Sequence, residues 1–403
     1  MKLLSSQPFW PIRDGLPATY PPLERDVRCD VAIVGGGITG ALVAWHLVAA
    51  GIDAIVLDRR EVAHGSTAGS TSLLRYEIDE PLYKLAQEIG VDRAARSYRR
   101  CCDAIDAIAR LVKKLHLHCG FERKSSLLLA SQRSHVGALR KEFDARRAAG
   151  FDVAWWSRAR LLAESSLPQP AAIHSSEGAQ VDAYLLTHGL LAAARKRGAQ
   201  IHDRTAVTRT RFHSRGVELQ TSRGCSVRAR RLVVASGYEA GSFLPESVTE
   251  LHSTFAIISE PLKRFTGWPA DRCLIWETAR PYVYLRTTDD HRAIIGGYDE
   301  PFRDPTTRDR MLPAKSAALQ RRFRQFFPRI PFEQSGAWAG TFAETAHGLP
   351  YIGRHAKVPH TWFALGYGGN GITYSLLAAE LIRDQMLGRV NRDEELFGFE
   401  RKI

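Results

Sequence analysis

The 403-residue sequence has no apolar run close to the roughly 20 residues that span a bilayer, so no membrane-spanning helix is expected. Its N-terminal stretch, MKLLSSQPFWPIRD, lacks the apolar core of a signal peptide, and we therefore expect a cytoplasmic location. Only six cysteines occur, and they show neither the paired CxxC spacing of a metal site nor a disulfide framework. We expect reduced thiols and no bound metal.

Acidic residues are scarce relative to basic ones, since 43 Asp and Glu oppose 56 Lys and Arg and give a formal net charge of +13. Such a charge raises nucleic acid, an acidic membrane surface or an anionic small molecule as partners. The basic clusters at Arg96–Arg100, Arg195–Arg197 and Arg228–Arg231 lack interleaved aromatic residues, and no nucleic-acid-binding motif accompanies them. We interpret the charge as a solvated basic surface and expect no nucleic-acid partner.

A dinucleotide-binding fingerprint is present near the N-terminus. The run Asp30–Val34 is short, apolar and β-branched, as a buried parallel strand should be. It is followed, with G-x-G-x-x-G spacing, by Gly35, Gly37 and Gly40. The first glycine permits a tight turn, the second lets the backbone approach a pyrophosphate, and the third lets the next helix pack closely on the strand. The N–H groups at the start of that helix then face the phosphates.

The residues after the glycines complete the unit. An apolar helix is predicted over Ile38–Ala50 and ends before Gly51, after which Ala54–Leu57 forms a second strand. Asp58 ends that strand near the spacing, roughly 20 residues on, at which a carboxylate accepts hydrogen bonds from an adenosine ribose. Strand, glycines, helix, second strand and acid together predict a bound dinucleotide, and on this stretch alone it is either NAD(P) or FAD.

A second glycine-rich turn occurs near the C-terminus. Thr361–Leu365 is predicted as a strand, Gly366–Gly371 as the turn, and Ile372–Leu387 as an apolar helix that ends before Gly388. A nicotinamide dehydrogenase does not require a second such turn so far along the chain, whereas an extended FAD needs contacts at both ends. This turn favours FAD.

The remaining chain divides into helical and strand-rich parts. Residues 1–28 are rich in proline and are predicted as an extended arm, not a helix, whose aromatic residues dock onto the body. Long helices are predicted from about Pro81 to Leu117. Strands are predicted at 126–130, 200–203, 206–212, 216–221, 226–228, 231–236, 251–259, 274–276, 282–287 and 293–297. The last four look antiparallel and indicate a second domain.

The two glycine turns, the Ser/Thr/Gly loop at 64–72 and the run Val233–Glu239 together resemble the D-amino-acid-oxidase-like (DAO) family of FAD-dependent oxidoreductases. The resemblance covers most of the chain and is nearest the gamma-glutamylputrescine oxidoreductase branch, with glycine and sarcosine oxidases more distant. It implies an α/β fold with an FAD-binding Rossmann-like domain of the glutathione-reductase type over 1–80, 171–245 and 334–403. A second, α+β substrate domain, built on an antiparallel sheet, would take 81–170 and 246–333.

The resemblance also implies which residues hold FAD. The N-terminal turn would hold the pyrophosphate together with Gly237, Asp58 would hold the ribose, and Val207 would contact adenine through its backbone. The C-terminal turn would lie against the isoalloxazine ring. The full predicted set is Gly35, Gly36, Gly37, Ile38, Thr39, Gly40, Asp58, Arg59, Ser66, Thr67, Val207, Gly237, Gly340, Gly368, Gly369, Asn370, Gly371, Ile372 and Thr373.

Family members with covalently bound flavin use a cysteine shortly before the C-terminal turn or a histidine in the loop after the second strand. The corresponding stretches here, Gly336–Gly340 and Ser66–Gly69, offer neither nucleophile, and His64 lies two residues before Ser66. We therefore predict noncovalent FAD.

In sarcosine-oxidase-like members, an arginine after the small-residue loop and a lysine in the C-terminal turn bind the substrate carboxylate. Arg75 matches the arginine, whereas Thr373 stands at the lysine position, so half of this carboxylate clamp is missing. Arg75 alone, Arg75 with Arg286, or a different amine as substrate would each accommodate the change. The candidate substrate-binding set is Arg75, Arg286, Tyr284 and Thr373, and no side-chain base is assigned.

The implied reaction is oxidation of the C–N bond of a small amine or amino acid to an imine. The α-hydrogen would pass as hydride to flavin N5, and oxygen or another acceptor would take the electrons. Two alternatives stay open from the residues alone. One is an NAD(P)-dependent dehydrogenase, in which Arg59 and Arg60 hold a 2′-phosphate, and the other is a flavoprotein that binds and modifies RNA.

Overall fold

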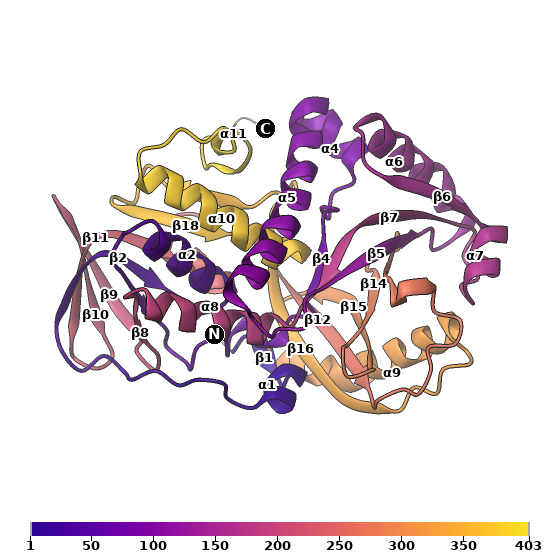
Figure 1. Ribbon diagram of the computed structural model, residues 1–403, viewed down its shortest axis with the longest axis horizontal. Coiled ribbons are helices and arrows are strands. Elements are labelled where there is room, and N and C mark those ends of the chain that lie inside the picture. Colours follow the sequence, from indigo (N-terminus) through magenta and orange to yellow (C-terminus); the bar gives the residue numbers. More distant parts are fainter. Residues whose placement is uncertain (1, 402–403) are drawn as a thin grey trace.

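Two β-sheets organise the chain in the computed structural model, which describes residues 2–401 (Figure 1). The eight-stranded sheet has the order β17 (Tyr351–Arg354), β18 (Thr361–Leu365), β11 (Ser226–Val234), β2 (Val27–Val34), β3 (Ala54–Leu57) and β8 (Gln200–His202). Its remaining strands are β10 (Gly216–Thr221), which pairs with β11, and β9 (Val207–His213), which pairs with β10. From β18 to β8 all neighbouring strands are parallel.

The parallel strands are apolar because both of their faces are covered. Along β2, Val31 and Ile33 pack into one core, whereas Ala32, between them, packs into the core on the other face. The first core is shared with α2 (Ile38–Ala49), α8 (Ala183–Lys196) and α10 (Gly371–Met386), which lie next to one another over the sheet (Figure 1). These strands therefore end in a common edge, beside the start of α2 and α10.

The ten-stranded sheet is mostly antiparallel. Its order is β1 (Leu4–Ser5), β16 (Gln334–Glu344), β12 (Glu250–Ser259), β15 (Ala293–Pro301), β14 (Val283–Thr287), β13 (Leu274–Glu277), β5 (Glu122–Leu129), β7 (Ala171–Gln180) and β4 (Leu73–Arg75), with β6 (Val153–Ser157) paired to β7. The pair β5–β13 is parallel. A second apolar core lies between this sheet and α9 (Pro305–Phe326).

The other helices are α1 (Phe9–Asp14), α3 (Ser66–Gly69), α4 (Leu82–Ile89), α5 (Val91–Leu115), α6 (Val136–Ala148), α7 (Arg158–Glu164) and α11 (Glu394–Phe397). Short 3₁₀ turns occur at η1 (Arg133–His135), η2 (Gly237–Phe243), η3 (Ala270–Arg272) and η4 (Gly368–Asn370). No helix within residues 2–401 is long and apolar enough to cross a membrane.

The expected α/β class with a second, largely antiparallel sheet is confirmed. Sheet membership nevertheless crosses the expected domain boundaries. Strands β4, β7 and β16 belong to the ten-stranded sheet, although their residues were grouped with the cofactor-binding part. None of the three was predicted as a strand, because β4 has only three residues and polar or small residues interrupt the apolar pattern of β7 and β16. Hydrogen bonding to strands far along the chain, and not their local sequence pattern, places them in the ten-stranded sheet.

Two local predictions were wrong. Residues 1–28 were expected to contain no helix, yet α1 spans Phe9–Asp14. Pro11 lies in its first turn, where the missing N–H has no intrahelical partner to lose, so the proline does not prevent a helix. The two strands expected at 226–228 and 231–236 are one strand, β11, in which exposed arginines alternate with buried residues. The aromatic residues of the arm do dock, since Phe9, Trp10 and Tyr20 are buried.

Candidate active site

The N-terminal glycine turn connects β2 to α2 and brings backbone segments into direct contact. Gly35 has φ +112°, and a Cβ added there would lie 2.4 Å from the carbonyl oxygen of Ala235 on the neighbouring strand. A Cβ at Gly40 would lie 1.8 Å from the carbonyl oxygen of Gly35. Both distances are far inside van der Waals contact, so only glycine lets α2 start against the end of β2.

Asp58 follows β3 and ties the glycine turn to the next segment. Its Oδ2 accepts a hydrogen bond from the Gly36 N–H at 2.6 Å, and its Oδ1 accepts one from the Arg60 N–H at 2.8 Å. Burial raises the pKa of Asp58 above its ordinary value, against the lowering effect of these two amide donors. The carboxylate is therefore fixed in place before any ligand arrives.

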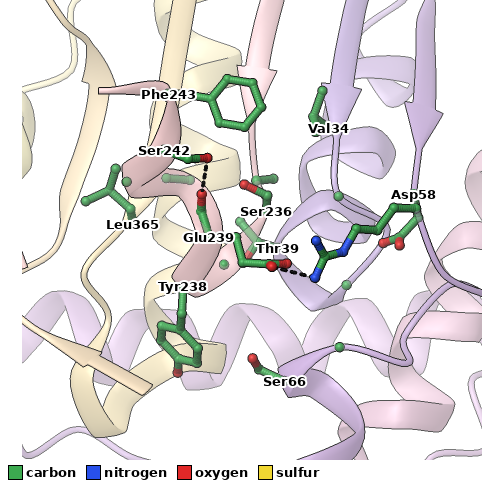
Figure 2. A pocket seen from close by; sticks show the side chains of 18 of the residues that line it. Val34, Thr39, Asp58, Ser66, Ser236, Tyr238, Glu239, Ser242, Phe243 and Leu365 are labelled. Atoms are coloured by element: carbon green, nitrogen blue, oxygen red, sulfur yellow. Dashed lines mark hydrogen bonds and ion pairs between the residues drawn. The ribbon is translucent and has the colours of Figure 1, made fainter. Parts of the chain in front are cut away.

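An outer cavity of about 890 Å³ lies over this turn (Figure 2). Its volume falls in the range of roughly 300–1,000 Å³ that is typical of ligand pockets. Predicted cofactor-binding residues that line it are Gly35, Gly37, Ile38, Thr39, Asp58, Arg59, Ser66, Thr67, Val207, Gly237, Gly371 and Ile372. Because these residues come from well-separated segments of the eight-stranded sheet's edge, the cavity suits an extended ligand.

Two buried serine hydroxyl groups in the outer cavity have no hydrogen-bond partner among residues 2–401. They are Ser66 Oγ and Ser236 Oγ, and both side chains line the cavity (Figure 2). Buried hydroxyls normally have partners, so these two fit the polar backbone of a dinucleotide. Thr67 is used differently, since its Oγ1 accepts a hydrogen bond from the Ile38 N–H at 3.0 Å.

The short turn η2 contributes Glu239, which the sequence reasoning missed. Glu239, labelled in Figure 2, forms an ion pair with Arg59. It forms a longer one, at 3.4 Å, with Arg60. The signal was available, because Glu239 follows the buried strand β11 much as Asp58 follows β3, and parallel strands end at one edge. Both arginines that the NAD(P) alternative assigned to a 2′-phosphate are thus engaged by a carboxylate of the chain itself.

The C-terminal glycine turn runs from β18 to α10 and is held by the segment after β4. The Gly369 N–H donates to Asp79 Oδ2 at 2.6 Å. Asn370 Nδ2 donates to the carbonyl oxygens of Arg75 and Glu77 at 3.1 and 2.9 Å. Asn370, predicted to contact the cofactor, therefore fastens the turn to the ten-stranded sheet.

A smaller inner cavity of about 130 Å³ adjoins the outer one. The residues that line both cavities include Ser66, Tyr238, Gly371 and Ile372. Other residues that line the inner cavity include Arg75, Tyr282, Tyr284, Asp299, Gly340, Gly368 and Gly369. The start of α10 therefore stands at the junction, with the extended cavity on one side and a small, partly charged chamber on the other.

Arg75 supplies positive charge to the inner cavity. Its side chain is 5% exposed, its guanidinium carbon lies 4.3 Å from the centre of the Trp276 ring, and its Nη2 lies 3.5 Å from Asp79 Oδ1. Burial acts to lower the pKa of Arg75, but Tyr282 and the nearby carboxylates raise it above the ordinary value, so the group stays charged. Its Nη1 is buried and has no partner within residues 2–401. A buried N–H of this kind fits a carboxylate ligand.

Arg286 and Thr373 lie behind the cavity walls. Arg286 Nη1 donates to three backbone carbonyl oxygens, those of Thr71, Ser72 and Val181, and burial lowers the pKa of Arg286 to about 10. The Thr373 hydroxyl donates to the Asn370 carbonyl oxygen at 2.9 Å. Of the four predicted substrate-binding residues, the structure thus brings Arg75 and Tyr284 together at the inner cavity and uses Arg286 and Thr373 to support its walls.

Three carboxyl groups near the inner cavity were missed. Asp79 accepts hydrogen bonds from the Gly369 N–H and from the Tyr282 hydroxyl at 3.2 Å. Burial raises the pKa of both Asp299 and Glu344 to about 7, and Asp79 adds to the rise in each case. A weak signal existed for Asp299, since the adjacent Gly296–Gly297 pair interrupts a strand, which is typical of a close backbone approach.

The two remaining predictions concern a covalent flavin link through His64 and the binding of a metal ion. His64 lines a surface pocket that shares Leu3, Arg59 and Arg60 with the outer cavity, and its Nδ1 lies 3.1 Å from the Val62 carbonyl oxygen. Noncovalent binding stays a prediction. Within residues 2–401, no group of three or more His, Cys, Asp or Glu side chains is arranged to hold a metal ion.

Comparisons with known proteins agree with this geometry. Residues 30–385 match the family profile described as FAD dependent oxidoreductase, DAO. The chain is 22% identical over 396 residues to a probable oxidoreductase, OrdL, of Haemophilus influenzae, which covers 94% of this chain and 87% of the relative. It is 24% identical over 393 residues to the gamma-glutamylputrescine oxidoreductase of Escherichia coli, covering 93% and 87%. The crystal structure of glycine oxidase from Geobacillus kaustophilus superposes with a TM-score of 0.77 at 22% identity, covering 93% of this chain and 99% of that one.

Proposed function

Because this chain belongs to the DAO family of FAD-dependent oxidoreductases, we propose that it oxidises the C–N bond of a small amine or amino acid to an imine. The family, the oxidoreductase class and FAD as cofactor, all predicted from the sequence, are confirmed, and the NAD(P) alternative is set aside. The names of two relatives, gamma-glutamylputrescine oxidoreductase and glycine oxidase, support an amine or amino acid as substrate. The observation that carries the proposal is the unpaired guanidinium N–H of Arg75 in a chamber that opens into the cofactor cavity.

The residues of the outer cavity fit FAD. Asp58 would hold the ribose, the turn at Gly35–Gly37 the pyrophosphate, and the unpartnered hydroxyls of Ser66 and Ser236 the polar chain of the cofactor. The N-terminus of α10 directs partial positive charge toward the junction of the two cavities. When bound, FAD supplies the hydride acceptor for the α-hydrogen of the substrate.

The side chains of the inner cavity position the substrate in this proposal. Arg75 holds a substrate carboxylate and so orients the neighbouring C–H bond toward the junction. Trp276 stacks against the Arg75 guanidinium, and Tyr282 and Tyr284 form part of the wall, so aromatic rings flank the group that holds the carboxylate. Positioning of the substrate is what the chain contributes, and the geometry assigns no side chain as a base.

The test is anaerobic reduction of the bound flavin. The purified holoenzyme is mixed without oxygen with single amines, N-methyl amino acids, and D- and L-amino acids, and the flavin absorbance is followed. We expect a yellow protein whose colour is bleached by at least one of these compounds and returns with an electron acceptor. A colourless protein, or a yellow one that no member of the panel bleaches, contradicts the proposal.

A further inference from the structure

Asp299 is a second charged group in the inner cavity, and its position is built by close packing of two strands. It lies on β15 and lines the chamber together with Arg75. Two residues earlier, Gly297 has φ +124°, and a Cβ there would lie 2.1 Å from the Tyr282 carbonyl oxygen. Only glycine lets β15 approach the start of β14 so closely, and this approach sets where Asp299 points.

The carboxyl group of Asp299 is only partly satisfied by the chain. Thr254 hydrogen-bonds to it, but Oδ1 is buried and has no partner among the residues that the structure describes. A buried carboxylate oxygen without a partner is costly, and a cationic ligand would remove that cost. The unpaired Nη1 of Arg75 in the same chamber is its positive counterpart.

The charged and titratable groups around Asp299 favour a cation. They are Asp79 after β4, Arg75 on β4, Arg280 and Tyr282 before β14, Tyr284 on β14, Lys315 on α9 and Glu344 on β16. Lys315 is already paired, since its Nζ donates to Glu300 at 2.6 Å and to the Tyr298 carbonyl oxygen at 2.8 Å. Arg280 donates to the Asp79 carbonyl oxygen at 2.9 Å. Within residues 2–401, neither cation hydrogen-bonds or ion-pairs with Asp299 itself.

We infer that Asp299 binds the ammonium group of the substrate while Arg75 holds its carboxylate; the ammonium gives up one proton to solvent before the C–H bond is oxidised, because hydride transfer requires the nitrogen lone pair. The inference deepens and rests on the proposed function, and it names the substrate class as a small zwitterion, an α-amino acid or N-alkyl amino acid. The inner cavity, at about 130 Å³, is much smaller than the outer cavity of about 890 Å³, so it suits a small substrate. A monoamine would leave Arg75 unpaired, and a diamine would add a second cation beside it.

The experiment uses the two charged ends of such a substrate as separate probes. Ammonium, which has no C–H bond to oxidise, and acetate are titrated into the holoenzyme at pH 8 and constant ionic strength, and the change in flavin absorbance reports binding. We expect Asp299→Asn to weaken ammonium binding about tenfold or more and to strengthen acetate binding, because a negative charge next to acetate is removed. A general loosening of the chamber would instead weaken the binding of both ammonium and acetate.

A pH series adds a second readout. Because burial raises the pKa of Asp299 to about 7, the ionised form that binds a cation is populated only as the pH rises through that value. Ammonium affinity of the unaltered protein should therefore rise between pH 6 and pH 8 while acetate affinity falls. Asp299→Asn should flatten both curves. Glu344→Gln, which removes the other carboxyl group that titrates near 7, should leave the ammonium curve rising.

The matched control is Glu260→Gln, one residue past the end of β12. Glu260 pairs with Arg292 and is not part of the inner cavity lining, so its variant should bind both probes as the unaltered protein does. Unchanged ammonium affinity in Asp299→Asn, or equal loss of both probes, overturns the inference. If the probes respond as expected and no amine bleaches the flavin, the ligand assignment stands and the proposed oxidation fails.

Discussion

At the scale of single residues, Arg75 is the group whose replacement should change substrate affinity most directly. Arg75→Lys keeps the positive charge but loses the planar fork that can donate two parallel hydrogen bonds to a carboxylate. For an amino acid that bleaches the flavin, we expect kcat/KM to fall about 10- to 100-fold, mainly through KM, as the loss of one or two charged hydrogen bonds implies. Steady-state kinetics with FAD content measured on the same sample give the answer.

Arg286 offers a contrast for that prediction. It is as buried as Arg75, but its donors are taken up by backbone carbonyl groups and its guanidinium carbon lies 5.5 Å from the centre of the Trp10 ring. Arg286→Lys should lower the melting temperature and leave the KM of the remaining folded enzyme close to that of the unaltered protein. If Arg286→Lys raises KM as Arg75→Lys does, Arg286 also binds the substrate and is not only a support of the cavity wall.

Single residues also show which parts of the candidate site could be predicted from the sequence and which could not. Asp58 and the glycines of the N-terminal turn were predictable because their roles depend on neighbours within one strand–helix–strand unit. Arg75 came only with the family resemblance. Asp79 had no signal, and Asp299 had only the weak one of the nearby Gly296–Gly297 pair, because each becomes a site residue through partners far along the chain: Tyr282 and Gly369 for Asp79, and Thr254 for Asp299. No local pattern encodes such meetings.

At the scale of elements, the start of α2 depends on Gly40. A methyl group there would overlap the Gly35 carbonyl oxygen, so Gly40→Ala must push the helix away from the turn. We expect at least tenfold weaker FAD binding and a loss of stability on the order of 1–3 kcal/mol, the usual cost of overpacking. FAD content after purification and urea unfolding measure the two effects.

A helical glycine with free space is the control for that variant. Gly137 on α6 has no atom within 4 Å of an added Cβ, so Gly137→Ala should leave FAD binding unchanged. Because Gly137 is the second residue of α6 and not in the helix interior, the gain in stability should be at most about 0.5 kcal/mol. Equal FAD affinity in Gly40→Ala and the unaltered protein would refute the close-contact argument.

Elements with a strong local pattern were predicted well. The strands over Ala54–Leu57 and Thr361–Leu365 have the expected bounds, and α10 begins within one residue of its predicted start. The missed strands β7 and β16 carry polar or glycine residues, and their β-structure is fixed by neighbours such as β5 and β12. Pairing with distant strands determines that these segments are strands. The same pairing puts them in the ten-stranded sheet, whereas the sequence grouped their residues with the cofactor-binding part.

At the scale of the whole molecule, the cavities join the two sheets. The outer cavity takes residues mainly from the edge of the parallel sheet, and the inner cavity takes Arg75, Tyr284 and Asp299 from the ten-stranded sheet. The C-terminal turn is bound to both, because Gly369 and Asn370 hydrogen-bond to the segment after β4. A ligand that spans the two cavities therefore contacts elements of both sheets, and it should stabilise the folded chain as a unit.

Removal of FAD tests this coupling together with the prediction of noncovalent binding. Acid precipitation should leave a colourless pellet and a yellow supernatant, since no covalent bond holds the flavin. The FAD-free protein should melt at a lower temperature, and added FAD should raise the melting temperature in proportion to the logarithm of its concentration. At 100 times Kd the stabilisation is about 2.7 kcal/mol, which for a chain of this size corresponds to roughly 3–5 °C.

Colour retained in the pellet would establish a covalent link, for which His64 would be the first residue to replace. A melting temperature that does not respond to added FAD would show instead that the cofactor does not contact the outer cavity as assigned, because binding only to the folded state must stabilise it.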